Sequence, residues 1–230
     1  MALTRAKRDI DWEVESVVSI PIAVSRSWEV TSTFNNPSTS DQNRYALIAV
    51  ANEDSGGGAQ VSSISVGGEL ATRVEGAFVA TTFSDEVVLY SLTESQLNSL
   101  GTSETISVIF TSTPDSFTIA SAIYSNVLQS SPIVGVGTMS QASGSPMVSV
   151  SASAEDDGVS VYAFTDGTVT TVTSISPGFN EVADITTPSS GGNTALVFEK
   201  IPSVAPVETV DITVTTTLRL AAVLANLRSA

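Results

Sequence analysis

Carboxylates are the main catalytic resource of this chain, because the sequence contains no histidine and no cysteine. A glycosidase needs two carboxylates placed across a sugar-binding cleft. The candidates for such a pair are Glu69, Glu75, Asp85, Glu86 and Asp184. Any acidic β-rich chain offers pairs of this kind, so the carboxylates alone do not define an active site.

Aromatic side chains would be needed to line a sugar cleft, and few are available. They include Trp12, Trp28, Tyr45, Tyr90, Tyr124 and Tyr162. Most fall at apolar positions of predicted strands, which favours packing in the core over a platform for sugar rings.

Two other kinds of chemistry are excluded by the residues present. A serine hydrolase needs a base and a G-x-S-x-G turn, and the chain has neither, since Gly144-Ser145 lies in the turn 142–146. Gly135-Val136-Gly137 is not followed by a helix that could bind a dinucleotide phosphate, so it reads as a glycine-bearing strand or bulge. We therefore expect no catalytic residue, no cofactor and no enzymatic activity.

Calcium is the only candidate metal, because it binds oxygen ligands. The chain has no cysteine thiolate and no histidine imidazole, the ligands that zinc and other transition metals prefer. Two acidic loops could supply oxygens, residues 52–54 and 155–158. Neither matches an EF-hand loop, and turn chemistry explains both, so we predict no metal site.

The charge balance limits the possible partners. The formal net charge is −15, and the sequence pI is about 4.1. Such a chain repels phosphate groups, so nucleic acid and anionic membranes are poor partners, whereas a basic protein surface or a saline medium fits. Residues 1–8 are basic but lead into acids rather than an apolar signal-peptide core, so we expect a protein made in the host cytoplasm without a signal peptide.

Short apolar runs separated by turn residues dominate the chain. About a dozen strands are predicted, among them 45–50, 61–66, 78–83, 87–92, 105–111, 117–124, 147–153, 159–164, 168–175, 195–201 and 209–215. One short connector helix is predicted at Thr93–Leu100, where Thr93 can cap the N-terminus and Gly101 can end it. The pattern predicts an all-β fold, a jelly-roll-like antiparallel sandwich with one connector helix.

The N-terminal segment alternates strictly. From 9 to 24 the even positions are apolar apart from Ser16, and Asp9, Asp11, Glu13 and Glu15 occupy odd positions. This period of two predicts a strand, with the acids forming a solvated face, a cation site or a contact for a basic partner. We predict an assembly arm over residues 1–24 and a sandwich domain over 25–230.

The end of the chain is ambiguous. Residues 218–227 could form a buried final strand, but Ala, Leu, Arg and Asn dominate there, and Leu220, Val223, Leu224 and Leu227 have helical spacing. Periodicity alone leaves strand and helix open.

Short motifs along the chain resemble a β-sandwich family found in tailed-phage virion proteins and bacterial surface proteins. Residues 43–50 (NRYALIAV) are similar to a family strand "N-R-L-L-L-V", and 61–68 (VSSISVGG) are similar to "V-S-S-V-T-Y-G-G". Residues 86–92 (EVVLYSL) resemble "V-E-L-W-Y-L", and a "T-I-S-V" strand follows at 105–108. Residues 218–228 stand where the family has a final strand, which favours a strand there. The resemblance covers 20–230, departs at Ser65-Val66 and Leu220, and brings no catalytic residues.

The resemblance and the lack of a signal-peptide pattern together give the expected function. We expect a structural protein of a tailed-phage virion, a capsid decoration or head-fibre subunit, with a tail or baseplate component or a carbohydrate-binding adhesin module as alternatives. The expected partners are other virion proteins and copies of the chain itself, as a homo-oligomer. The arm 1–24 would join neighbouring subunits by strand addition.

Overall fold

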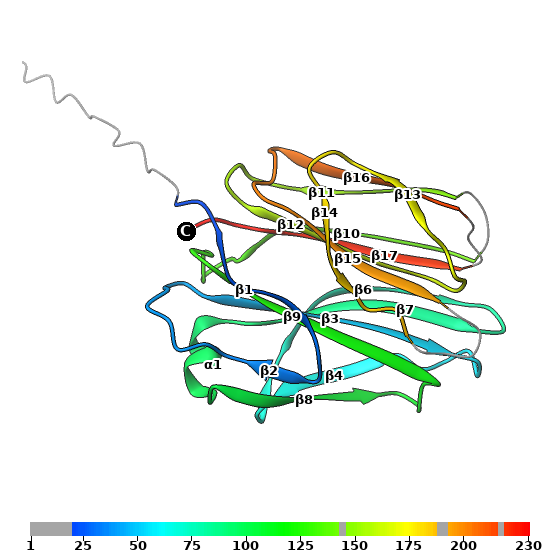
Figure 1. The fold of residues 1–230 in the computed structure, drawn as a ribbon, viewed down its shortest axis with the longest axis horizontal. Helices are drawn as coiled ribbons and strands as arrows, with labels where there is room; N and C mark the ends of the chain where they lie inside the picture. The colour runs from blue at the N-terminus through cyan, green and yellow to red at the C-terminus, as the bar shows by residue number, and fades with distance from the viewer. Residues whose placement is uncertain (1–19, 143–145, 188–192, 216–218) are drawn as a thin grey trace, which may run out of the picture.

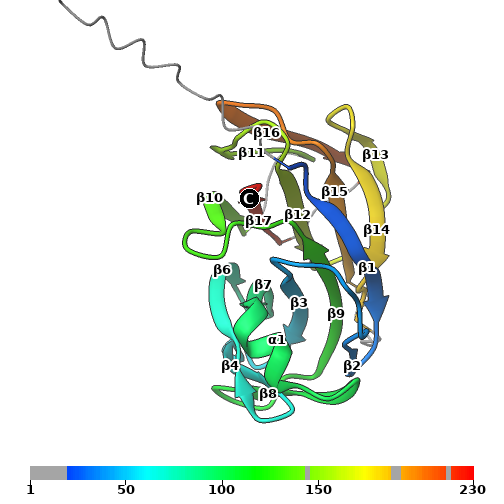
Figure 2. The ribbon, with the colours of Figure 1, turned by 90° about the vertical axis from the view of Figure 1, so that its left-hand side faces the viewer.

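A computed structural model describes residues 20–142, 146–187, 193–215 and 219–230. Four antiparallel sheets are stacked in four layers (Figure 1). The view turned by 90° shows the same stack, with the short helix α1 (Glu94–Ser99) at the end of the first sandwich (Figure 2). Among the described residues there is no helix that could span a membrane.

The first sandwich contains an inner and an outer sheet. The inner sheet has the order β1 (Ala23–Val30), β9 (Ser116–Ser125), β3 (Tyr45–Asp54), β7 (Ser84–Leu92) and β6 (Thr72–Ala80). The outer sheet has the order β2 (Thr33–Asn35), β8 (Ser103–Phe110), β4 (Val61–Val66) and β5 (Glu69–Leu70).

The second sandwich is built in the same way. Its inner sheet has the order β10 (Ile133–Gln141), β17 (Leu220–Leu227), β12 (Val159–Asp166), β15 (Thr194–Lys200) and β14 (Asn180–Asp184). Its outer sheet has the order β11 (Met147–Ser153), β16 (Val207–Val214) and β13 (Val172–Ile175). Numbering the strands within each sandwich gives the same order in both halves, apart from the small strand β5.

The inner sheets pack face to face, so the stack has three apolar cores. One core lies inside each sandwich, and the third lies between β3, β7 and β9 of the first and β12, β15 and β17 of the second. Ten of the 25 buried residues of this third core are alanine. Small side chains let two sheet faces approach closely, which makes the third core a dense contact between the sandwiches.

Burial on both faces explains the sequence pattern. Every residue of β3, β7, β12 and β17 is buried, and the central parts of these strands are apolar on both faces. The outer strand β11 alternates instead, with only Val148, Val150 and Ala152 buried. A strand covered on one face needs apolar residues at every second position only.

The predicted fold class, an all-β antiparallel sandwich with one connector helix, is confirmed. Residues 220–227 form a strand, and Gly135 and Gly137 lie within β10, while Leu218 lies outside the described residues. The strands β5 and β14 are not predicted by the sequence analysis.

The domain organisation of the structure differs from the one expected. Residues 25–230 hold two stacked sandwiches, each with its own inner and outer sheet, rather than one. The boundary at residue 24 falls within β1, since Ala23 and Val24 already pair with Ser125 and Tyr124. Of the predicted arm, residues 1–19 lie outside the described residues.

Candidate functional site

The candidate catalytic carboxylates are dispersed over three sheets. Glu69 lies on β5, Glu75 on β6 and Asp184 on β14. Asp85 and Glu86 are neighbours on β7, so their side chains point to opposite faces of the inner sheet. Both are fully buried, and the two therefore cannot flank a substrate in one cleft.

Asp85 faces the second sandwich. Its Oδ2 accepts a hydrogen bond of 2.6 Å from Arg219 Nε, and Glu53 Oε1 lies 3.6 Å from Arg219 Nη2. Burial raises the pKa of Asp85, and the contact with Arg219 opposes that rise. Arg219 precedes β17, so this ion pair ties the second sandwich to the first.

Glu86 faces the core of the first sandwich. Its Oε2 accepts hydrogen bonds of 2.7 Å from the Val61 backbone and from Asn52 Nδ2. These contacts hold the loop before β4 against β3 and β7. Burial raises the pKa of Glu86, while both hydrogen bonds oppose the rise.

We expect Glu86→Gln to change how stability depends on pH. Because the pKa is raised in the folded state, Glu86 holds its proton to higher pH there than in the unfolded chain. Its contribution to stability therefore falls as pH rises from about 4, the ordinary glutamate value, through the folded pKa. Glutamine lacks this titration, so the stability of the variant relative to wild type should increase with pH. Urea unfolding at several pH values from 4 to 8 measures this, and parallel curves would contradict the assignment.

The two acidic loops considered for calcium have structural roles. Asp54 accepts hydrogen bonds from the backbone of Gly56, Gly58 and Ala59 and so closes its own loop. In the second loop, Glu155 forms an ion pair with Arg228, and Asp156 Oδ1 accepts from Ala205 N. Within the described residues no group of three or more acidic side chains could hold a metal ion.

The described candidate aromatics are all buried, which agrees with core packing. Trp28 Nε1 donates to Tyr124 Oη over 2.9 Å, and Tyr124 Oη donates to Glu199 Oε2 over 2.7 Å. These two hydrogen bonds link β1 and β9 of the first sandwich to β15 of the second. Tyr45, Tyr90 and Tyr162 are buried as well, and Trp12 lies outside the described residues.

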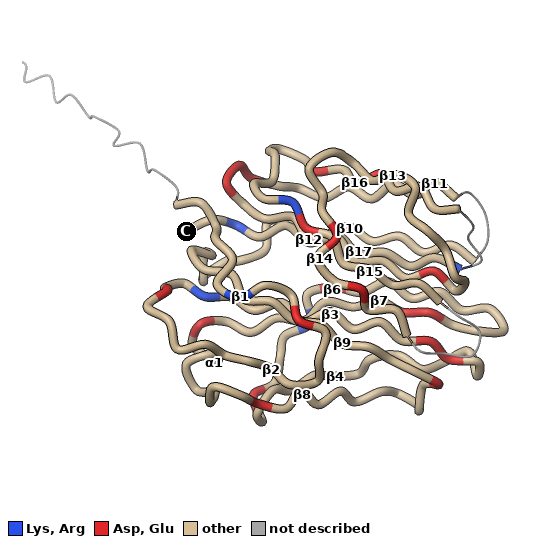
Figure 3. Tube along the Cα trace, viewed as in Figure 1, with Lys and Arg blue, Asp and Glu red and all other residues tan. Residues whose placement is uncertain are grey.

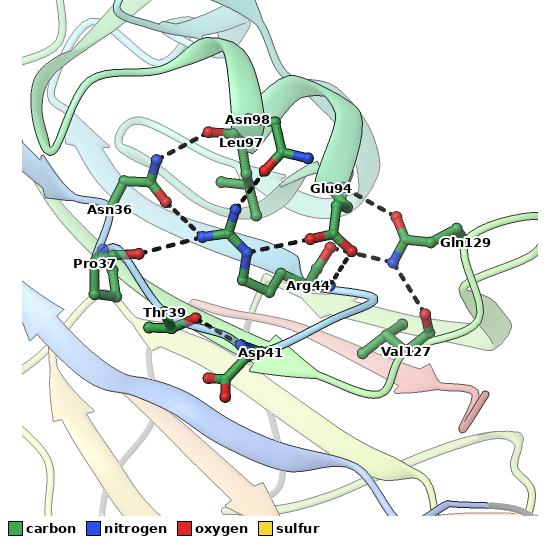
Figure 4. Close-up of polar contacts among 10 residues, drawn as sticks. All are labelled: Asn36, Pro37, Thr39, Asp41, Arg44, Glu94, Leu97, Asn98, Val127 and Gln129. Carbon is green, nitrogen blue, oxygen red and sulfur yellow. Dashed lines mark hydrogen bonds and ion pairs between the residues drawn. The ribbon is translucent and has the colours of Figure 1, made fainter.

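A polar hollow of about 330 Å³ lies between α1 and the loop that precedes β3. Arg44 on its wall is buried, and its guanidinium donates to Glu94, Asn36 Oδ1, Asn98 Oδ1 and the Pro37 carbonyl (Figure 4). These acceptors are all protein groups that position the loop and the helix, so Arg44 acts as a clamp. Acidic positions are spread over both sandwiches (Figure 3).

The outer edge of β8 is only partly covered. β2 pairs with Ser103–Thr105, and Ile106 N donates to Ser32 O over 2.8 Å. There the preceding chain crosses to the inner sheet, where Thr31 N donates to Ile119 O. Among the described residues, no strand lies along this edge of β8 from residue 107 to 110.

A cleft of about 620 Å³ opens beside this edge. Val108 and Phe110 of β8 and Phe117 of β9 supply its apolar wall. The rings of Phe110 and Phe117 are 5.0 Å apart, and Phe117 is 43% exposed. An adjoining hollow of about 330 Å³ runs on past Phe117 to Val30, which is 50% exposed.

The second sandwich covers the equivalent edge. There β11 pairs with β16 over seven residues, from Met147↔Thr213 to Ser153↔Val207. In the first sandwich this edge stays open because β2 begins only at Thr33, opposite Thr105, after the chain has crossed from the inner sheet. Phe110 and Phe117 were not singled out from the sequence, where they fall only within the predicted strands 105–111 and 117–124.

The fold and this edge define an all-β protein of two stacked jelly-roll-like sandwiches with an apolar, incompletely paired strand edge. No family model, curated protein or solved structure gives a significant match to the chain.

Proposed function

We propose that this chain is a non-enzymatic structural protein of a tailed-phage particle that associates with copies of itself and with other virion proteins. A capsid decoration or head-fibre subunit is the leading form of the proposal, and a tail or baseplate component is its alternative. The resemblance of β3, β4, β7, β8 and β17 to virion sandwich strands favours this setting.

The observation that carries the proposal is the contrast between the interior and the edge of the molecule. The candidate catalytic pair on β7 is buried and bound to protein groups, and ion pairs and a third core join the sandwiches. The edge of β8 instead leaves apolar side chains and strand backbone exposed. A rigid block with an open edge suits assembly better than turnover of a substrate.

The adhesin alternative gains no support from the tryptophan and tyrosine side chains that the structure describes. A carbohydrate platform needs exposed rings, and the candidate aromatics are buried there. The hollow beside Arg44 has polar walls, but its guanidinium is engaged by the protein.

Immunogold labelling of particles from a lysate of the source strain tests the proposal. An antibody raised against the full chain should label intact virions at regular positions on heads or tails. Label confined to cell surfaces or to the soluble fraction would contradict the proposal. Label on heads would support the decoration or head-fibre form, and label on tails would support the tail or baseplate form.

A further inference from the structure

We propose that residues 10–16 of a second copy of this chain add as a strand to the open edge of β8, with Trp12 and Val14 in the cleft beside Phe110 and Phe117. This inference rests on the proposed self-association and names the surfaces that make it.

The backbone of β8 has free bonding positions at this edge. Ile106 N bonds to Ser32 on the β2 side, whereas Thr111 N bonds to Gln60 next to β4. Backbone groups alternate between the two sides of an antiparallel strand, so those of Val108 and Phe110 point to the uncovered side. An added strand would pair with these groups as the N-terminal part of β11 pairs with β16 in the second sandwich.

The side chains of the cleft match the pattern of the arm. A strand added here has one face toward the apolar wall and one toward solvent. Residues 10–16 read Ile-Asp-Trp-Glu-Val-Glu-Ser, which gives one apolar and one acidic face. The equivalent strand β11 has the same alternation, with Val148 and Val150 buried and the residues between them exposed. A cleft of about 620 Å³ is in the size range of pockets that hold aromatic groups.

The position of residues 20 and 21, where the arm joins the fold, indicates that the arm binds a second copy rather than the edge of its own chain. Asn126 Nδ2 donates to Pro21 O, which places the start of the described chain at the far end of β9 from Phe117. From Asn126 to Ile119, where the open edge begins, seven extended residues span roughly 23 Å. If residues 10–16 pair with β8, only residues 17–19 separate them from Ile20, and the four steps from residue 16 to Ile20 reach at most about 14 Å. A neighbouring subunit has no such constraint.

Cross-linking of two single-cysteine variants tests the inference, because the chain has no cysteine of its own. Glu13→Cys lies on the acidic face of the arm, and Ser107→Cys lies at an exposed position of β8. The two full-length variants carry different tags and are mixed with a short bismaleimide. We expect a mixed dimer of the two tagged chains. Ser149→Cys, at an exposed position of β11, is the matched control and should give severalfold less.

A second pair of substitutions tests the cleft itself. Phe117→Lys in the Ser107→Cys chain should reduce the mixed dimer severalfold, whereas Leu70→Lys, at an exposed position of the same sandwich, should leave it unchanged. Both positions are exposed enough for the fold to tolerate lysine.

Three results would overturn the inference. The first is equal cross-linking of Glu13→Cys to Ser107→Cys and to Ser149→Cys. The second is an unchanged yield of mixed dimer with Phe117→Lys. The third is a cross-link that forms only within one chain carrying both Glu13→Cys and Ser107→Cys. If particles are labelled by antibody but no mixed dimer forms, the proposed function stands and the docking site does not. If the mixed dimer forms and particles stay unlabelled, the docking site stands and the virion setting does not.

Discussion

Replacing Arg219 by alanine is expected to lower the free energy of unfolding by about 3–5 kcal/mol. Arg219 Nε lies 2.6 Å from Asp85 Oδ2, and its Nη2 lies 3.6 Å from Glu53 Oε1. All three residues are buried, so the substitution leaves carboxylates without their cation inside the protein. For a chain of this size the melting temperature should fall on the order of 10 °C.

A surface ion pair gives the matched control. Arg228 and Glu155 also form a short contact, of 2.7 Å, but their side chains are 30% and 43% exposed. Water solvates these charges in both states, so Arg228→Ala should cost less than about 1 kcal/mol. Thermal and urea unfolding of both variants measures the difference. Equal losses would show that Arg219 does not join the sandwiches as described.

Placing a charge in the third core is expected to have an effect of similar size. Ala163 lies on β12, fully buried between the inner sheets. Ala163→Glu puts a carboxylate there with no counter-ion designed for it, at a cost of about 3–5 kcal/mol. Because both sandwiches meet at this core, we expect one cooperative unfolding transition at a lower temperature.

Calorimetry measures the effect of Ala163→Glu, and Ser149→Glu is the control. Ser149 is exposed on β11, so a glutamate there should change stability by no more than about 0.5 kcal/mol. If the sandwiches were loosely joined domains, Ala163→Glu would leave two independent transitions, each near its original temperature. That outcome would contradict a shared third core.

Local sequence patterns predicted most of the individual strands. The run Tyr45–Val50 is fully buried because inner-sheet strands are covered on both faces, and the alternation of 147–153 marks an outer strand. Thr93 caps α1 as expected, with the N3 side chain of Gln96 completing the capping box. These features depend on residues close together in the sequence, which is why periodicity finds them.

The arrangement of the strands into two sandwiches could not be predicted in the same way. The halves share a strand order, which depends on pairing between strands far apart in the chain, such as β1 with β9 and β10 with β17. For the same reason, the sequence gives no sign that Asp85 and Glu86 are both buried. The edge beside Phe110 and Phe117 is open because β2 begins only at Thr33, opposite Thr105, and only the paired sheet reveals this register.

Self-association is the central claim, and light scattering after size-exclusion chromatography tests it most directly. The full chain should elute with a mass that is a multiple of 23.7 kDa, and a chain that starts at Ile20 should elute as a monomer. A full chain that stays at 23.7 kDa over a hundredfold range of concentration would contradict the claim.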